Sequence, residues 1–190
     1  MIYNYWYVVS ALVLCAVLAG VLFVLVRRRR RMDLGAAVRA VALDAEHRVL
    51  VPSGMGGQIE IEHLLLTAYG IVVVDTKHFE GMIFGSDRMD EWTVMTKNRR
   101  FTFPNPQHAL YDRIAAIRRL VRDIPVHGHV VFSPLANFSK GRPKEVLLAN
   151  EFVEHYRKPD RAEIERIKAD FWPYWAEIKA SIESLAPRGR

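Results

Sequence analysis

The sequence is poor in residues that cross-link or chelate. Its 190 residues include a single cysteine, Cys15, which excludes a fold held by disulfide bonds and a zinc site built from several cysteines. It contains no HExxH, GxSxG or Gly-Lys-Ser/Thr motif, so the short signatures of zinc proteases, serine hydrolases and phosphate-binding loops are absent. With 51% hydrophobic and 25% charged residues, the composition is that of a folded protein and excludes a disordered or fibrous one.

Charge is missing from the start of the chain. The first 26 residues carry no charged side chain, and 23 of them are hydrophobic. The 22 residues at 5–26 would form a helix of about 33 Å, long enough to cross the hydrocarbon core of a bilayer. Aromatic residues gather at its beginning and five arginines, at 27–31, follow it, which is typical of a transmembrane helix with its basic end in the cytoplasm. A cleaved signal peptide would need a basic start and a shorter apolar core ending in small residues, and the sequence has neither.

These features predict a single-pass protein of the inner (plasma) membrane. Residues 5–26 would anchor it in the lipid bilayer, with the N-terminus outside and the folded part in the cytoplasm. The arginine run also accounts for the pI of 9.6, because residues 32–190 carry 22 basic and 21 acidic residues. A basic pI is therefore no evidence for nucleic-acid binding here. We predict an anchor at 1–31, a folded domain at 32–158 and an amphipathic C-terminal helix at 159–190.

Hydrophobic periodicity predicts an α/β fold for the rest of the chain. We expect helices at 33–44, 107–123 and 160–186, the last kinked by Pro173, and strands at 59–67, 71–77, within 81–96 and at 126–132. The stretch between residues 45 and 58, rich in turn formers, is predicted to be a loop. Long apolar runs in the first two strands favour a hairpin of interior strands that is covered on both faces. The order of the elements predicts one mixed central sheet flanked by helices.

A pair of opposite charges ends the second strand of this hairpin. Asp75 and Lys77 are two residues apart, so they project from the same face of the strand. Glu60 and Glu62 share a face of the neighbouring strand, and hairpin pairing would bring Glu62 near Asp75. Two carboxylates in one site suit a Mg²⁺ ion, and a lysine beside them can orient water and stabilise charge on a phosphate. The alternative is a solvent-exposed ion pair at a strand end.

Several stretches together resemble the nuclease-related domain called NERD. They are 61–77 (IEHLLLTAYGIVVVDTK), 81–85 (GMIFG), Trp92, Asn105-Pro106 and 130–138 (VVFSPLANF). The resemblance spans roughly residues 33–155. This family is similar to the PD-(D/E)xK nuclease superfamily and to Mrr-like restriction endonucleases, so the resemblance implies a restriction-endonuclease-like fold.

The resemblance also implies roles for the charged residues of the hairpin. It places Glu62 and Asp75 on the metal-binding positions and Lys77 on the catalytic lysine that positions water, with Mg²⁺ as the implied cofactor. Glu62 stands where the family usually has aspartate, and Asp75 where it usually has glutamate. The family's first helix usually carries a Gly-Glu pair that completes the metal site. This chain has Gly35-Ala36 there, and the nearest acid downstream is Glu46.

A second group of residues is predicted to contact nucleic acid. Lys97, Arg99 and Arg100 are interleaved with aromatic residues, which is typical of a surface that binds a nucleic-acid strand; an exposed hairpin is the alternative. The family usually has a glutamine a few residues after its Asn-Pro pair. Here Gln107 follows at once, and we include it among the candidate nucleic-acid contacts.

Two functions are consistent with these patterns. The first is a membrane-tethered, Mg²⁺-dependent nuclease that hydrolyses phosphodiester bonds of DNA or RNA, and the presence of Glu62, Asp75 and Lys77 favours it. The second is a catalytically inactive NERD-like module that binds a protein partner or acts as a scaffold at the cytoplasmic face of the membrane. The near-neutral charge of residues 32–190 and the missing first-helix glutamate favour the second.

Overall fold

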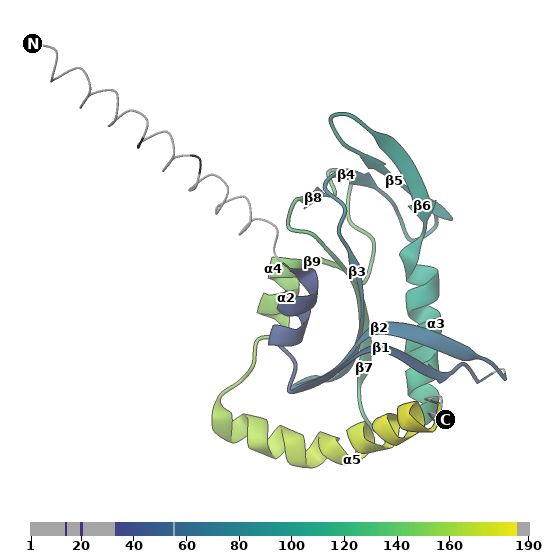
Figure 1. Ribbon diagram of the computed structural model, residues 1–190, viewed down its shortest axis with the longest axis vertical. Coiled ribbons are helices and arrows are strands. Elements are labelled where there is room, and N and C mark those ends of the chain that lie inside the picture. Colours follow the sequence, from purple (N-terminus) through teal and green to yellow (C-terminus); the bar gives the residue numbers. More distant parts are fainter. Residues whose placement is uncertain (1–13, 15–19, 21–32, 55, 186–190) are drawn as a thin grey trace, which may run out of the picture. The chain divides into compact units, whose positions relative to one another are not determined.

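The computed structural model describes Leu14, Gly20, residues 33–54 and residues 56–185 (Figure 1). The membrane helix predicted at 5–26 therefore lies outside the described residues, except for Leu14 and Gly20. Within the described ranges, no helix combines the length and the apolar character needed to span a membrane. The chain divides into two units after Asp33, and the elements below belong to the unit that begins at Leu34.

A five-stranded mixed sheet forms the centre of this unit. Its strands, in spatial order, are β1 (Asp44–Pro52), β2 (Gln58–Thr67), β3 (Gly70–Lys77), β7 (Val126–Phe132) and β9 (Val146–Leu148). β1, β2 and β3 pair antiparallel, whereas β3, β7 and β9 pair parallel. The predicted hairpin is confirmed as β2 and β3. The residues at 64–66 and 71–74 are fully buried, because one apolar core lies on each face of the sheet.

Helices cover both faces of the central sheet (Figure 1). They are α2 (Leu34–Ala40), α3 (Pro106–Leu120), α4 (Ala149–His155) and α5 (Arg161–Leu185). One core receives Leu110 from α3 and Trp175 from α5, and the other receives Leu34 from α2 and Phe152 from α4. The mixed α/β architecture expected from the sequence is therefore confirmed. α5 continues as one helix through Pro173.

Strands between 81 and 104 form a second sheet, so the expectation that the central sheet continues through 81–96 is wrong. The second sheet has the order β6 (Arg100–Pro104), β5 (Glu91–Met95), β4 (Gly81–Phe84) and β8 (Ala136–Asn137). Gly81, at φ 95°, redirects the chain after β3, and a Cβ there would lie 2.6 Å from the Met95 carbonyl oxygen. Trp92 then packs against Phe132 of the central sheet, with ring centroids 6.3 Å apart.

Two boundaries near the start of the folded unit also differ from the prediction. The first helix ends at Ala40, and β1 occupies 44–52, where a loop was expected. The missing signal has a physical reason: Asp44 and Glu46 of β1 are partly buried acids. Lys179 of α5 neutralises them at 3.5 and 3.1 Å. Because that lysine is more than 130 residues away in the chain, local hydropathy does not reveal a packed strand.

The start of α3 is fixed by its first residues and matters for the site. Pro106 occupies the first helical position, and the Asn105 side chain accepts a hydrogen bond from the Gln107 backbone N–H at 2.9 Å. Asn105 also donates from its amide nitrogen to the Met89 carbonyl oxygen at 2.9 Å. This cap joins the helix to the second sheet, and it aims the first turns of α3 at the ends of β2 and β3.

Candidate active site

An open cleft of about 710 Å³ lies where β2, β3, β6 and the start of α3 meet. It is lined by the charged and polar residues His47, Arg48, Glu60, Glu62, Asp75, Lys77, Asn105 and Arg113 and by Phe79, Phe103, Pro104, Pro106 and Ala109. The predicted residues Glu62, Asp75 and Lys77 are thus brought together in one cleft. The lining thus combines charged side chains with aromatic and apolar ones.

Asp75 is the buried carboxylate of the cleft. Its residue is 4% exposed, and its Oδ2 accepts a hydrogen bond from Arg113 at 2.7 Å. Its Oδ1 is also buried and has no hydrogen-bond partner among the residues that the structure describes. Burial raises the pKa of Asp75, while the charges of Arg113 and Lys77 oppose that shift. An unpaired buried carboxylate oxygen is costly, so this atom is poised to accept a donor or a cation.

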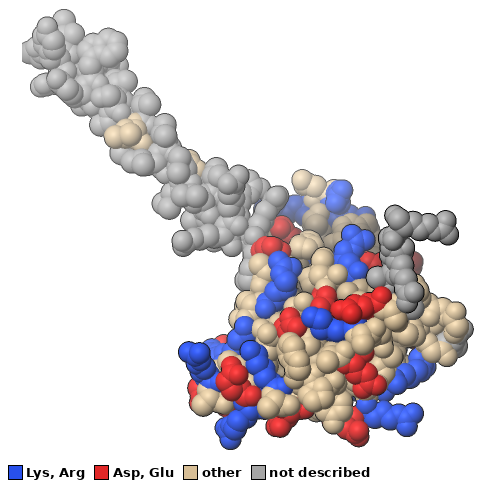
Figure 2. Space-filling view, turned by 60° about the horizontal axis from the view of Figure 1, so that its bottom comes forward, with Lys and Arg blue, Asp and Glu red and all other residues tan. Residues whose placement is uncertain are grey.

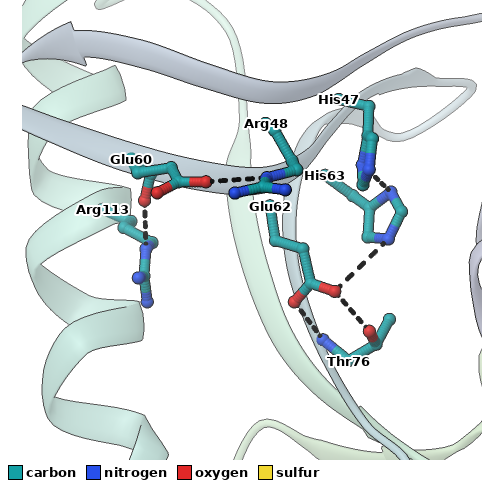
Figure 3. Close-up of polar contacts among 7 residues, drawn as sticks. All are labelled: His47, Arg48, Glu60, Glu62, His63, Thr76 and Arg113. Atoms are coloured by element: carbon teal, nitrogen blue, oxygen red, sulfur yellow. Dashed lines mark hydrogen bonds and ion pairs between the residues drawn. The ribbon is translucent and has the colours of Figure 1, made fainter.

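Glu62 is held in a fixed orientation beside Asp75. Extending the β2–β3 register by one residue from the His63–Val74 pair sets Glu62 opposite Asp75. Its Oε2 accepts from the Thr76 backbone N–H at 2.8 Å and its Oε1 from the Thr76 hydroxyl at 2.5 Å (Figure 3). His63 Nε2 lies 3.7 Å from Oε1, and His63 in turn contacts His47. This network fixes the carboxylate without covering it, since the side chain is 35% exposed.

Arg113 is the cleft residue that sequence reasoning missed. From α3 it donates through Nε to the Glu60 backbone carbonyl at 2.6 Å and through Nη1 to Asp75. Figure 3 shows it beside Glu60, with Arg48 on the other side of that residue. No local pattern in the sequence identifies it, because its partner Asp75 lies 38 residues earlier on another element. Hydrophobic periodicity alone treats such an arginine as a solvated position.

Arg48 marks a distortion at the rim of the cleft. It adopts φ 51°, and the β1–β2 ladder skips it between the His47–His63 and Val49–Ile61 pairs. Its side chain pairs with Glu60 at 3.1 Å, but both side chains are more than half exposed, so this ion pair adds little stability. The cleft therefore holds three acidic and three basic side chains, and its charges balance.

The cleft contains at least the minimum number of carboxylate ligands with which proteins commonly hold Mg²⁺. Mg²⁺ is commonly held by one or two carboxylates, with water and substrate phosphate as the other ligands, and Asp75 Oδ1 and Glu62 supply two carboxylates. In the described part of the chain, no group of three or more His, Cys, Asp or Glu side chains is arranged to hold a metal ion. Glu46 does not complete the set, because it faces Lys179 and does not line the cleft.

The comparisons with known proteins concern the part of the chain that holds the cleft. Residues 42–133 match the nuclease-related domain, NERD. Every residue that lines the cleft falls inside the nuclease-related domain. The chain is also 31% identical over 118 residues to an uncharacterized protein of Bacillus anthracis, pXO1-01, in an alignment that covers 58% of this chain and 56% of that protein. No solved structure matches the chain.

The candidate nucleic-acid contacts of the nuclease-related domain separate into two places. Lys97, Arg99 and Arg100 are exposed on and beside the turn between β5 and β6, with the Arg99 guanidinium 5.9 Å from the Phe101 ring centroid. They do not line the cleft, but β6 leads from Arg100 to Phe103 at its wall, about 10 Å along a strand. These three residues therefore lie on an exposed hairpin, whose surface is open to solvent.

Gln107 lies apart from the cleft within the nuclease-related domain. It is 1% exposed, and its amide nitrogen donates to the Asp87 carboxylate and to the Lys144 carbonyl oxygen, each at 2.8 Å. These bonds tie α3 to two loops. The structure therefore gives Gln107 a role in packing, and its predicted contact with nucleic acid has no support from its position.

Proposed function

We propose that the cleft binds a nucleic-acid strand and hydrolyses a phosphodiester bond with the help of Mg²⁺. The observation that carries this proposal is Asp75 Oδ1, a buried carboxylate oxygen without a partner among the described residues, in a cleft shared with Glu62 and Lys77. A surface ion pair, the alternative at the sequence level, would be solvated, whereas Asp75 is 4% exposed.

The residues of the cleft would have different roles in such a reaction. Asp75 and Glu62 would hold the cation, which when bound there would polarise a phosphoryl oxygen and lower the pKa of a water. The Thr76 hydrogen bonds keep the Glu62 carboxylate in place. Lys77 projects from the same face as Asp75, where its ammonium can orient the attacking water and stabilise negative charge on the phosphate.

The aromatic part of the cleft lining suits the bases of a nucleic-acid strand. Phe79 and Phe103 form it, with ring centroids 4.7 Å apart, and offer surfaces on which a base can stack. From there β6 leads to the exposed Lys97, Arg99 and Arg100, which would contact phosphates farther along the strand. A substrate lying along β6 would meet the basic side chains first, then the aromatic rings, and then the carboxylates of the cleft.

A second candidate function is strand binding without hydrolysis. The observation in its favour is the ion pair between Arg113 and Asp75 at 2.7 Å, which neutralises a carboxylate that a metal would otherwise need. In this case the domain would be an inactive NERD-like module, whose partners are nucleic acid or a protein at the membrane.

Titration calorimetry on the full chain in detergent separates the two functions. We expect Mg²⁺ and Mn²⁺ to bind, binding to be lost in Asp75→Asn, and a labelled oligonucleotide to be cleaved only by the metal-loaded parent protein. Asp112→Asn, which removes an exposed carboxylate of α3 outside the cleft, serves as the matched control and should leave binding unchanged. Oligonucleotide binding with no heat from either ion would favour the inactive module.

We propose further that residues 5–26 anchor the domain at the cytoplasmic face of the inner membrane. The support is the uncharged 22-residue stretch followed by five arginines. The chain should stay in the membrane pellet after alkaline extraction. Protease added to intact spheroplasts should leave the domain whole. Digestion of the domain there would show that it lies on the outer side of the membrane.

A further inference from the structure

We propose that Arg113 is a positioning residue that competes with the divalent cation for Asp75, and that it transfers to the substrate phosphate when the cation binds. This inference rests on the proposed function, since it concerns the same cleft. It adds a built-in counter-ion that sets how tightly the metal binds and that couples metal binding to strand binding.

The position of Arg113 is fixed from two sides. Its Nη1 donates to Asp75 Oδ2 at 2.7 Å, and its Nε donates to the Glu60 carbonyl oxygen at 2.6 Å. The side chains of Arg113 and Asp75 are 21% and 5% exposed, so water screens this ion pair only weakly. The guanidinium therefore spans from α3 to both strands of the hairpin, and one of its two anchors is the proposed metal ligand.

The positive charge of Arg113 would repel a divalent cation bound to Asp75. Mg²⁺ binds carboxylate oxygens at about 2.0–2.1 Å, so an ion on Asp75 Oδ1 would lie within about 7 Å of the Arg113 Nη1 that is bonded to Oδ2. Two like charges this close in a partly buried site repel each other strongly. Either the ion binds weakly, or Arg113 leaves Asp75.

The cleft offers Arg113 a new partner when it leaves. Arg113 and Lys77 line the same space, and a guanidinium binds a phosphate through two parallel N–H···O bonds. Because the guanidinium is a rigid plane, the whole group would turn toward the phosphate, and its Nε would release the Glu60 carbonyl oxygen as Nη1 releases Asp75. A strand that engages Arg113 would remove the competitor from Asp75, and the metal would in turn release Arg113 for the strand. Binding of the two ligands is then mutually favourable.

Metal titration of Arg113 variants tests the competition without measuring activity. Arg113→Gln should bind Mn²⁺ at least about tenfold more tightly than the parent chain, because it removes the positive charge. Arg113→Lys keeps the charge and should stay close to the parent. Arg118→Gln is the matched control: Arg118 lies on the same helix and donates to the Val126 carbonyl oxygen at 2.9 Å, but it contacts no cleft carboxylate, so affinity should not change.

Strand binding tests the transfer. With an oligonucleotide whose linkages resist hydrolysis, Mn²⁺ should tighten binding to the parent chain several-fold, and this coupling should vanish in Arg113→Gln. Thermal unfolding of each variant establishes that it is folded, and Arg113→Met, which also removes the positive charge, takes the place of Arg113→Gln if the glutamine variant is unstable.

The failure of this inference differs from the failure of the proposed function. Equal Mn²⁺ affinity in the parent and Arg113→Gln would overturn the competition and leave the proposed function intact. No Mn²⁺ binding by any of the proteins would overturn both.

Discussion

Burial decides the charge of a single histidine on the far side of β7 from α3. His129 Nε2 lies 2.7 Å from the Tyr156 hydroxyl oxygen, and burial lowers the pKa of His129 to about 4, with His155 adding to the shift. Its Nδ1 is buried as well, so a second proton on the ring would be shielded from water. The neutral ring is therefore the form that the fold accommodates.

This residue makes stability depend on pH. Above pH 6.5 the ring is neutral in both the folded and the unfolded states, so it has no effect. As the pH falls from 6.5 to about 4, the unfolded chain binds a proton that the folded chain does not, and the free energy of unfolding falls by up to about 3 kcal/mol. Urea unfolding of the parent and of His129→Gln should give curves against pH that converge on acidification. Parallel curves would show that His129 does not titrate in this way.

At the residue scale, the sequence predicted one half of the candidate site. Asp75 and Lys77 could be paired because period-two alternation is a local property of β3, and Glu62 followed from hairpin pairing. Arg113 could not, because an arginine on a helix 38 residues after Asp75 has no local sign of its partner. Local sequence patterns do not predict contacts between elements that are distant in the sequence.

At the element scale, the turn between β2 and β3 sets the register that aligns Glu62 with Asp75. Gly70 adopts φ 107°, and its carbonyl oxygen accepts a hydrogen bond from the Thr67 hydroxyl at 2.9 Å. A Cβ at Gly70 would lie 2.3 Å from the Pro125 carbonyl oxygen, on the backbone just before β7. Glycine is therefore required here both for its backbone conformation and for the close approach of another strand.

Gly70→Ala should lower the free energy of unfolding by about 3 kcal/mol, since it adds a backbone clash to a strained conformation. Gly56→Ala is the control: Gly56 has φ 82° but open space around its Cβ position, so only the conformational penalty of about 1 kcal/mol applies. Denaturant titration gives both values. Equal losses would mean that Pro125 moves aside and that the clash does not fix the turn.

The elements that the sequence predicted well are those whose own residues determine them. The β2–β3 hairpin and α3 have long apolar runs or a regular apolar stripe, and both form within a few residues of the expected bounds. β1 was missed because its acids are neutralised by Lys179 of α5. One sheet was predicted where the structure has two, because the hydrophobic pattern of a strand does not indicate which other strand it pairs with.

At the scale of the whole folded unit, basic and acidic residues are nearly equal in number. Figure 2 shows basic and acidic side chains interspersed over the face that it draws, in keeping with the 22 basic and 21 acidic residues of 32–190. A long-range field that attracts nucleic acid needs one sign of charge over a wide area. Under the proposed function, recognition of a nucleic-acid strand would therefore depend on short-range contacts in the cleft and along β6.

The C-terminal helix belongs to the same folded unit as the sheet, and one tryptophan joins them. Trp175 of α5 is fully buried, and its Nε1 donates to Asp44 of β1 at 2.8 Å. Trp175→Ala should lower the free energy of unfolding by about 3–5 kcal/mol, because it leaves a large cavity and removes a donor from a partly buried carboxylate.

Trp172 provides the matched control on the same helix. It is 47% exposed, so Trp172→Ala should change the free energy of unfolding by less than about 1 kcal/mol. Denaturant unfolding of the full chain, followed by circular dichroism, compares the two variants. If Trp175→Ala were as mild as Trp172→Ala, α5 would unfold independently of β1. The acids of β1 would then lose Lys179 and Trp175 without loss of the sheet, and residues 159–190 would be an appendage of the domain. A loss of several kcal/mol in a single transition would make α5 part of the cooperative core that holds β1 and β2 beside the cleft.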